Sequence, residues 1–192
     1  MLQMTAGTMD LDVFKYFFEC CVGNWTTERT YHYLTHQEVE RSHTEFRVDP
    51  ITPDLKQKVL TDNEYGDVAN LEDLPGFRLG FHTVSEKGEE VTQELRMLFV
   101  PKQQDGGWLE GDYLRDRAYE EARPIISEFR FNQDSRELLM TTRYTRTVSV
   151  DSILLVNPKM RIRRILNYQR PLEGEPLTTL SLVGFGVEQK AA

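Results

Sequence analysis

Residues 10–34 read DLDVFKYFFECCVGNWTTERTYHYL, and the change of pattern within this stretch indicates the fold. In its first half, apolar side chains recur at helical spacing, and Asp10 stands at the position of an N-cap. The pattern predicts a short amphipathic helix over 10–21, ended by Gly23. Its aromatic face must bury against a larger element, and the chain offers only one other, weaker helical pattern, over 54–60. We therefore expect the helix to pack on a sheet.

After this helix the chain reads as an antiparallel meander. Short runs rich in β-branched and aromatic residues alternate with turn clusters such as Gln104-Asp105-Gly106-Gly107. An open sheet of so many strands would leave costly edges, which favours closure into a barrel of about ten strands with room for one ligand. The strands are expected near Trp25–Thr35, Glu38–Val48, Gly76–Ser85, Val91–Val100, Gly107–Leu114, Arg117–Arg123, Ile125–Phe131, Glu137–Tyr144, Thr147–Val156, Met160–Tyr168 and Leu177–Val187.

Length and charge limit the function classes. The 192 residues suit one domain over 1–192, with residues 1–9 flexible. The net charge of −8 argues against broad nucleic-acid binding, which needs clustered cations. Since no apolar run reaches about twenty residues, no membrane span is expected. The stretch 49–74 reads as a long excursion between strands, and such excursions at a barrel mouth often serve as lids.

The two cysteines, Cys20 and Cys21, are sequence neighbours, and neighbouring cysteines rarely meet disulfide geometry. This favours a reducing compartment. The histidines show no metal-ligand spacing beside the cysteines, so no metal site is expected. Packing in the helix is a better reading of the cysteines than a catalytic pair of Cys21 with His32.

Arginines crowd the run MRIRRI at 160–165. Strand alternation places Arg161 and Arg163 on one face, and an arginine that points into the barrel needs a carboxylate partner. That partner is either Asp151 or a carboxylate of a ligand. A three-residue turn after position 156 puts Asp151 on the same face as Arg161, and a two-residue turn puts it on the other. A fully exposed ladder of ion pairs is the alternative.

Several scattered motifs together resemble one family. The element Gly23-Asn24-Trp25 matches the Gly-x-Trp that closes one end of lipocalin-type barrels, although a helix cap followed by a buried tryptophan would look the same. With it, the chain resembles the S-type (CpcS/CpeS) phycobiliprotein chromophore lyases over about residues 11–188. The matching residues are Phe18, Gly23, Trp25, Arg29, His32, Leu34, Leu114, Arg115, Asp116, Tyr119, Asn157, Pro158, Arg161 and Arg163.

The resemblance implies a mainly β, lipocalin- or calycin-like barrel that binds an open-chain tetrapyrrole such as phycocyanobilin. The bilin is a substrate and no cofactor is tightly bound. The family attaches the bilin through a thioether to a cysteine of a phycobiliprotein subunit, so the nucleophile belongs to the acceptor protein. The setting implied is a cyanobacterial cytoplasm or a plastid stroma.

The resemblance also implies site residues. Asp151 stands where relatives usually carry glutamate, and Phe81 where many carry tryptophan. Strict alternation puts His32 on the face opposite Arg29 unless a bulge intervenes. The implied catalytic residues are Asp151, Arg161 and His32, and the implied bilin-binding residues are Arg29, Arg161, Arg163 and Phe81.

Two other functions use the same cup. One is a carrier for a bilin or another amphipathic ligand, without transfer activity. The other is a subunit of a hetero-oligomeric lyase, because relatives can act in pairs. Either a homodimer or a heterodimer with a related subunit is compatible with the sequence.

Overall fold

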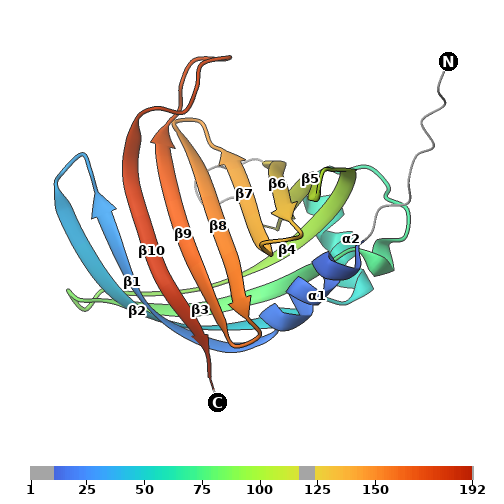
Figure 1. Ribbon diagram of the computed structural model, residues 1–192, viewed down its shortest axis with the longest axis horizontal. Helices are drawn as coiled ribbons and strands as arrows, with labels where there is room; N and C mark the ends of the chain where they lie inside the picture. The colour runs from blue at the N-terminus through green and yellow to red at the C-terminus, as the bar shows by residue number, and fades with distance from the viewer. Residues whose placement is uncertain (1–10, 117–123, 192) are drawn as a thin grey trace.

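The computed structural model describes residues 11–116 and 124–191. Its ten strands close into an antiparallel barrel in the order β1-β10-β9-β8-β7-β6-β5-β4-β3-β2 (Figure 1). The expected barrel is confirmed. The strands are β1 (Gly23–Tyr33), β2 (Glu38–Pro50), β3 (Gly76–Ser85), β4 (Glu90–Asp105), β5 (Trp108–Arg115), β6 (Ser127–Asn132), β7 (Glu137–Arg143), β8 (Thr147–Asn157), β9 (Met160–Gln169) and β10 (Leu180–Lys190).

Some expectations fall elsewhere. The strand expected at 117–123, the flexible segment 1–9 and Asp10 lie outside the described residues. The first helix begins at Asp12, so its N-cap is Leu11 and the cap expected at Asp10 is wrong. The strand expected over 177–187 lies three residues later, as β10. This displacement brings Glu188 into the barrel wall.

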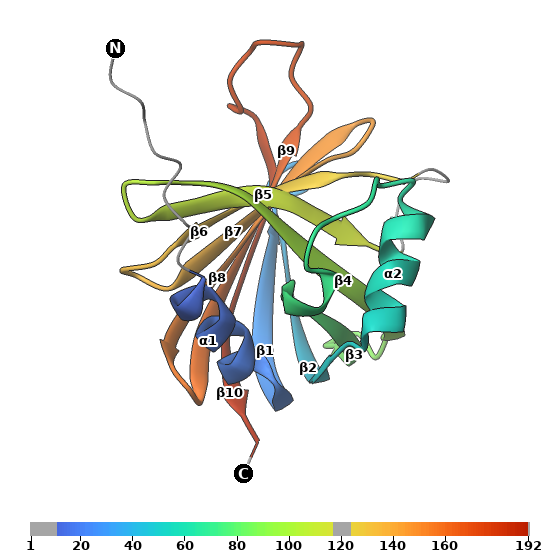
Figure 2. The ribbon, with the colours of Figure 1, turned by 90° about the vertical axis from the view of Figure 1, so that its right-hand side faces the viewer.

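Helix α1 (Asp12–Cys21) closes one end of the barrel (Figure 2). Its apolar face is aromatic: Phe14 and Phe17 are fully buried. The ring of Phe14 stacks on Phe129 of β6 at 5.2 Å and contacts Phe131 at 4.9 Å. Phe129 and Phe131 point inward because β6 alternates buried and exposed side chains. The helix therefore packs on the sheet, as its pattern predicted, and the structure places it on the inner face.

Helix α2 (Pro53–Asp62) packs on the outside of the barrel, beside β4 (Figure 2). The lid predicted for 49–74 is therefore wrong. The segment leaves the end closed by α1, because β2 pairs there with the start of β1. Its apolar side chains bury against outward-facing apolar residues of β4 and β5, which would otherwise be exposed. The cluster comprises Val59, Leu60, Leu98, Val100 and Leu114.

Among the fully described connections, those that follow β1, β3, β7 and β9 lie at the opposite end. Within the described ranges, no helix is long and apolar enough to cross a membrane. Because α1 blocks one end, the inner space is a cup that opens at the opposite end, where β1 and β2 are joined. We call this open end the mouth.

Candidate functional site

The cup has a volume of about 270 Å³ and two unlike walls. One wall, from β2 to β4, is apolar and includes Phe46, Phe77, Leu79, Phe81, Leu95 and Met97. The facing wall, from β8, β9 and β1, is polar and includes Arg29, Ser149, Asp151, Arg161, Arg163 and Asn167. An amphipathic, flat molecule would find an apolar surface on one side and hydrogen-bonding groups on the other.

An ion triad forms the floor of the cup. Glu188 is fully buried and accepts hydrogen bonds from Arg161 at 2.5 Å and Arg29 at 3.0 Å. The Arg161 guanidinium lies over the rings of Trp25, at 4.7 Å, and Phe46, at 5.1 Å. Burial raises the pKa of Glu188, but the neighbouring guanidinium groups outweigh it and hold that pKa below its usual range. Glu188 is therefore a buried carboxylate anion.

Trp25 joins this floor to α1. Its side chain is 1 % exposed, and its indole N–H donates to the carbonyl oxygen of Cys21 at 2.8 Å. The Gly-Asn-Trp element thus closes the barrel end as the family resemblance implies. Cys20 and Cys21 are buried in α1, and burial raises the pKa of the Cys21 thiol. This supports packing as the role of the cysteines.

Above the floor, Asp151 and Arg163 form a second ion pair. Arg163 donates to Asp151 at 3.1 Å, and both side chains remain partly exposed to the cup. The β8–β9 turn has two residues, Pro158 and Lys159, which alone would turn Asp151 outward. A register shift between Leu155 and Asn157 adds one residue to β8 and restores the inward face.

The exposed-ladder alternative fails for Arg161 and Arg163. It describes only their neighbour Arg164, which points outward and lies 3.5 Å from Glu137. The carboxylate partner that the sequence left open is Asp151 for Arg163, and Glu188 for Arg161.

A third polar group lies nearer the mouth. The guanidinium of Arg115 donates to the Tyr144 hydroxyl at 2.7 Å, and it lies 5.6 Å from the Tyr113 ring. Arg115 belongs to the matching residues of the family resemblance, together with its neighbours Leu114 and Asp116. Leu114 packs under α2, and Asp116 accepts a hydrogen bond from Arg96. Tyr119, the next matching residue, lies outside the described residues.

Two glycines of β10, Gly184 and Gly186, leave room for neighbouring side chains in the barrel wall. Gly186 lies between Arg29 of β1 and Arg163 of β9 in the ladder. A Cβ at Gly186 would lie 2.8 Å from Thr27 Oγ1 and 3.0 Å from Arg29 Cγ. The absence of a side chain at Gly186 therefore leaves room for Arg29 to lie against β10 and reach Glu188 on the same strand.

We predict that Gly186→Ala lowers the free energy of unfolding by about 1–3 kcal/mol, because the added methyl group overpacks the wall. Chemical denaturation would measure the change. Gly80→Ala is the matched control, since a Cβ there meets nothing within 4 Å. Equal stability of the Gly186 variant and the control would contradict the close-packing argument.

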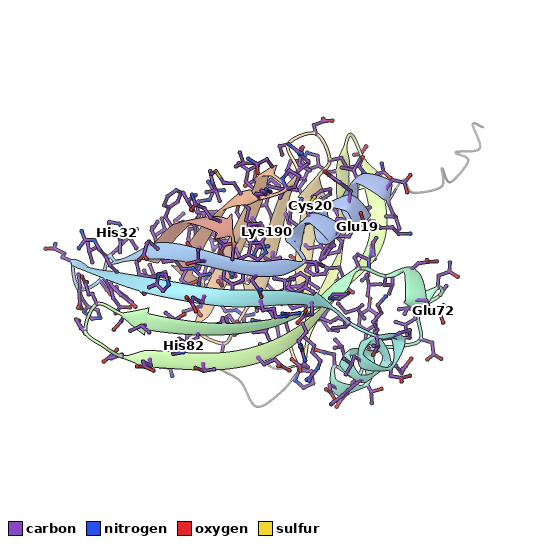
Figure 3. The ribbon with its side chains drawn as sticks, turned by 90° about the horizontal axis from the view of Figure 1, so that it is seen from below. Glu19, Cys20, His32, Glu72, His82 and Lys190 are labelled. Atoms are coloured by element: carbon purple, nitrogen blue, oxygen red, sulfur yellow. The ribbon has the colours of Figure 1, made fainter. Side chains whose placement is uncertain are left out.

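The structure separates His32 from the other site residues. β1 pairs with both neighbours without a register shift, so His32 faces outward and Arg29 inward. Figure 3 shows His32 at the hairpin end of β1, far from Cys20 and Lys190 at the closed end. Phe81, in contrast, lines the apolar wall of the cup. Arg29, Phe81, Asp151, Arg161 and Arg163 thus share one cavity, and His32 is outside it.

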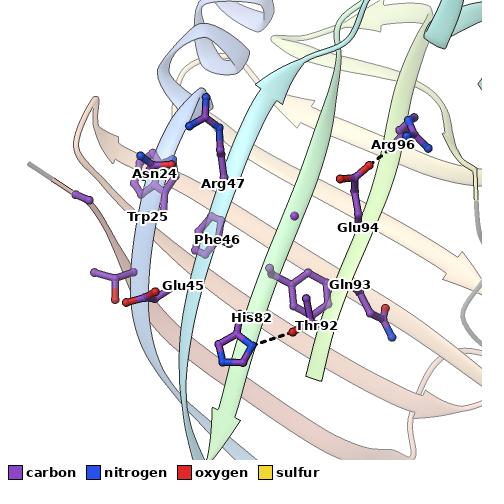
Figure 4. Close-up of a pocket in the computed structure, with 14 residues that line it drawn as sticks. Asn24, Trp25, Glu45, Phe46, Arg47, His82, Thr92, Gln93, Glu94 and Arg96 are labelled. Carbon is purple, nitrogen blue, oxygen red and sulfur yellow. Dashed lines mark hydrogen bonds and ion pairs between the residues drawn. The ribbon is translucent and has the colours of Figure 1, made fainter. Parts of the chain in front are cut away.

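A second hollow, of about 1140 Å³, lies on the outer face of β1 to β4 (Figure 4). Its polar side chains pair with one another: Arg96 donates to Glu94 at 3.1 Å, and His82 lies 2.9 Å from the Thr92 hydroxyl. These side chains are thus engaged on a surface that is open to water, although Arg96 Nε is buried without a hydrogen-bond partner within the described residues. We therefore place the candidate site in the cup.

Sequence reasoning missed Glu188 because the last strand was expected to end at Val187. The signal was present in the alternation of β10, where Gly184, Gly186 and Glu188 occupy one face. Tyr113, Tyr144 and Asn167 also line the cup, but as scattered polar residues they gave no sequence signal.

Comparison with known proteins agrees with this geometry. The family model described as CpeS-like protein matches residues 13–191. The chain belongs to the CpeS-like family. Its relatives include "Chromophore lyase CpcS/CpeS 1" of Synechococcus sp. (strain JA-3-3Ab), which is 60% identical over 94% of this chain and 97% of the relative. "Chromophore lyase CpcS/CpeS" of Thermosynechococcus vestitus is 24% identical over 77% of this chain and 79% of that protein.

A solved structure of this CpeS-like type shares the fold. The S-type phycobiliprotein lyase CPES from Guillardia theta superposes with a TM-score of 0.72 at 16% identity, and the match covers 93% of each chain. This chain therefore shares the fold of that structure.

Proposed function

We propose that this chain, a chromophore lyase of the CpcS/CpeS type, binds an open-chain tetrapyrrole in the cup and attaches it to a cysteine of a phycobiliprotein subunit. The observation that carries the proposal is the two-walled cup, in which Asp151, Arg29 and Arg163 face an apolar wall that includes Phe46 and Phe81. The bilin is a substrate that leaves with the acceptor. The proposed setting is a cyanobacterial cytoplasm or a plastid stroma.

Binding uses both walls. The conjugated rings of the bilin lie against Phe46 and Phe81, and its propionate groups pair with the inward guanidinium groups of Arg29 and Arg163. Each of these arginines has a buried Nε without a hydrogen-bond partner in the described residues. A bilin is too large to fit entirely inside a cavity of about 270 Å³, so part of the molecule extends toward the mouth of the cup.

Asp151 supplies the electrostatic part of the reaction. Its carboxylate accepts hydrogen bonds from the pyrrole N–H groups and thereby favours the protonated form of the tetrapyrrole. Protonation draws electron density from the conjugated system and makes the ethylidene group on ring A more electrophilic. Arg161 touches Glu188 and Trp25 and acts as a positioning residue for the floor.

The bond-forming step is an addition. The thiolate of the acceptor cysteine attacks the exocyclic carbon of the ethylidene group, so that a carbon–sulfur bond forms as the π bond of the ethylidene group breaks. The electron pair of that π bond moves into the tetrapyrrole, which takes up one proton in place of the proton that the thiol lost. No oxidant or reductant is needed. Because the acceptor supplies the nucleophile, the buried Cys20 and Cys21 need not take part.

The direct test mixes the purified chain with phycocyanobilin and an apo-phycobiliprotein subunit, and follows absorbance and zinc-stained denaturing gels. An acceptor whose cysteine is replaced by alanine is the control. Cysteine-dependent covalent colour that forms faster with this chain supports the proposal. Binding without transfer to the subunit would favour the carrier, and transfer that requires a second related chain would favour the hetero-oligomeric lyase.

We predict that Arg163→Ala weakens bilin binding by about 10- to 100-fold, the loss expected for a charged hydrogen bond of about 1.5–3 kcal/mol. A titration followed by absorbance measures the dissociation constant. The neighbouring Arg164→Ala is the matched control because its side chain points outward and is 52% exposed. If both variants bind like the unchanged chain, the propionates are held elsewhere.

A further inference from the structure

Asn167 carries a polar atom that the cup leaves without a partner. Its side-chain oxygen Oδ1 is buried and makes no hydrogen bond within the described residues. The residue lines the cup from β9, on the same face as Arg163 and Ile165. Buried acceptors in folded proteins are nearly always satisfied, so an orphan acceptor in a cavity indicates a ligand donor.

The backbone holds this side chain in place. Asn167 pairs with Ser149 of β8 and with Leu182 of β10, and its carbonyl oxygen accepts from the Ser181 hydroxyl at 3.0 Å. The position is therefore set by strands on both sides rather than by a loop. A site on a strand fixes the direction of a hydrogen bond better than one on a loop.

The unpartnered atoms of the polar wall are of two kinds, at two levels. Deep in the cup, Arg29 Nε and Arg163 Nε can only donate. Nearer the mouth, Asn167 Oδ1 can only accept. A complementary ligand therefore carries anionic groups deep in the cup and an N–H group nearer the mouth.

We propose that Asn167 is a specificity-determining residue of the cup: its Oδ1 accepts a hydrogen bond from a pyrrole or lactam N–H of the bound bilin. The assignment rests on the proposed function and deepens it. A hydrogen bond at this level fixes which edge of the pigment faces the mouth. Asn167 thus selects ligands by an N–H donor, separately from the selection of their carboxylates by Arg163.

The test compares two substitutions of nearly equal size. Asn167→Leu removes the acceptor, and Asn167→Asp keeps it. With phycocyanobilin as the probe, we expect binding about tenfold weaker for the leucine variant, together with a shifted absorption band of the complex. For the aspartate variant we expect an affinity within about threefold of the unchanged chain. Asn24→Leu, on the exposed outer face, is the matched control for the substitution.

Two results would overturn the proposal. One is a leucine variant with unchanged affinity and spectrum. The other is equal weakening by leucine and aspartate, which would assign the effect to shape. Thermal unfolding confirms that each variant folds, and Asn167→Ala replaces a leucine variant that does not, with the same expected loss. Failure of the unchanged chain to bind phycocyanobilin would instead remove the proposed function, and this assignment with it.

Discussion

Glu188→Ala is expected to lower the free energy of unfolding by about 3–5 kcal/mol, because it leaves the guanidinium groups of Arg161 and Arg29 without their shared carboxylate. Arg161 is 3% exposed, so water cannot replace the lost anion. The variant would also loosen the stack of Arg161 on Trp25, which closes the barrel below the cup. Urea unfolding followed by tryptophan fluorescence measures the change.

Glu110→Ala provides the comparison. Glu110 pairs with Arg130 at 2.7 Å, but both side chains are partly exposed, and such pairs contribute about 0–1 kcal/mol. If the two glutamate variants lose similar stability, the triad at the floor is not the element that holds this end of the barrel.

The same triad makes the stability of the fold depend on pH in the acid range. The pKa of Glu188 is lower in the folded state than in the unfolded chain, so its contribution is fully present above the ordinary glutamate pKa of about 4.3. The contribution is lost as the pH falls through the lowered pKa. The free energy of unfolding, measured from pH 7 downward, should therefore fall more steeply below about pH 4 in the unchanged chain. In Glu188→Gln this part of the pH dependence should be absent.

Asp151→Asn should slow bilin transfer by about 10²-fold or more while the barrel stays folded. Asparagine keeps the size of the side chain but removes the negative charge that favours the protonated tetrapyrrole. The absorption band of the bound bilin should accordingly move toward that of the unprotonated pigment. Affinity should change less than rate, because the propionates bind Arg163 and Arg29.

The measurement is a single-turnover transfer assay with a saturating bilin complex and an acceptor subunit. Asp49→Asn is a close control: Asp49 also pairs with arginine, and its side chain is 22% exposed against 25% for Asp151, but it lies on the outer wall. Unchanged rate and spectrum in Asp151→Asn would show that the carboxylate only orients Arg163.

The architecture followed from patterns that a single sequence displays. The aromatic face of residues 12–21 and the period-two strands after Gly23 predicted a barrel with a helix packed on its sheet, since an apolar face must be buried against a larger apolar surface. The inward direction of Arg161 and Arg163 also followed from alternation, and the family resemblance added the ligand class.

The arrangement of the cup depended on features that the sequence does not display. The inward direction of Asp151 depends on one bulge before Asn157. The position of α2 outside the barrel depends on the outward-facing apolar residues of β4 and β5 that it buries. Glu188 meets Arg161 only because β10 extends past Val187 and pairs with β9. Alternation determines which residues share a face within one strand, whereas partners between strands depend on register, and register is a property of the closed barrel.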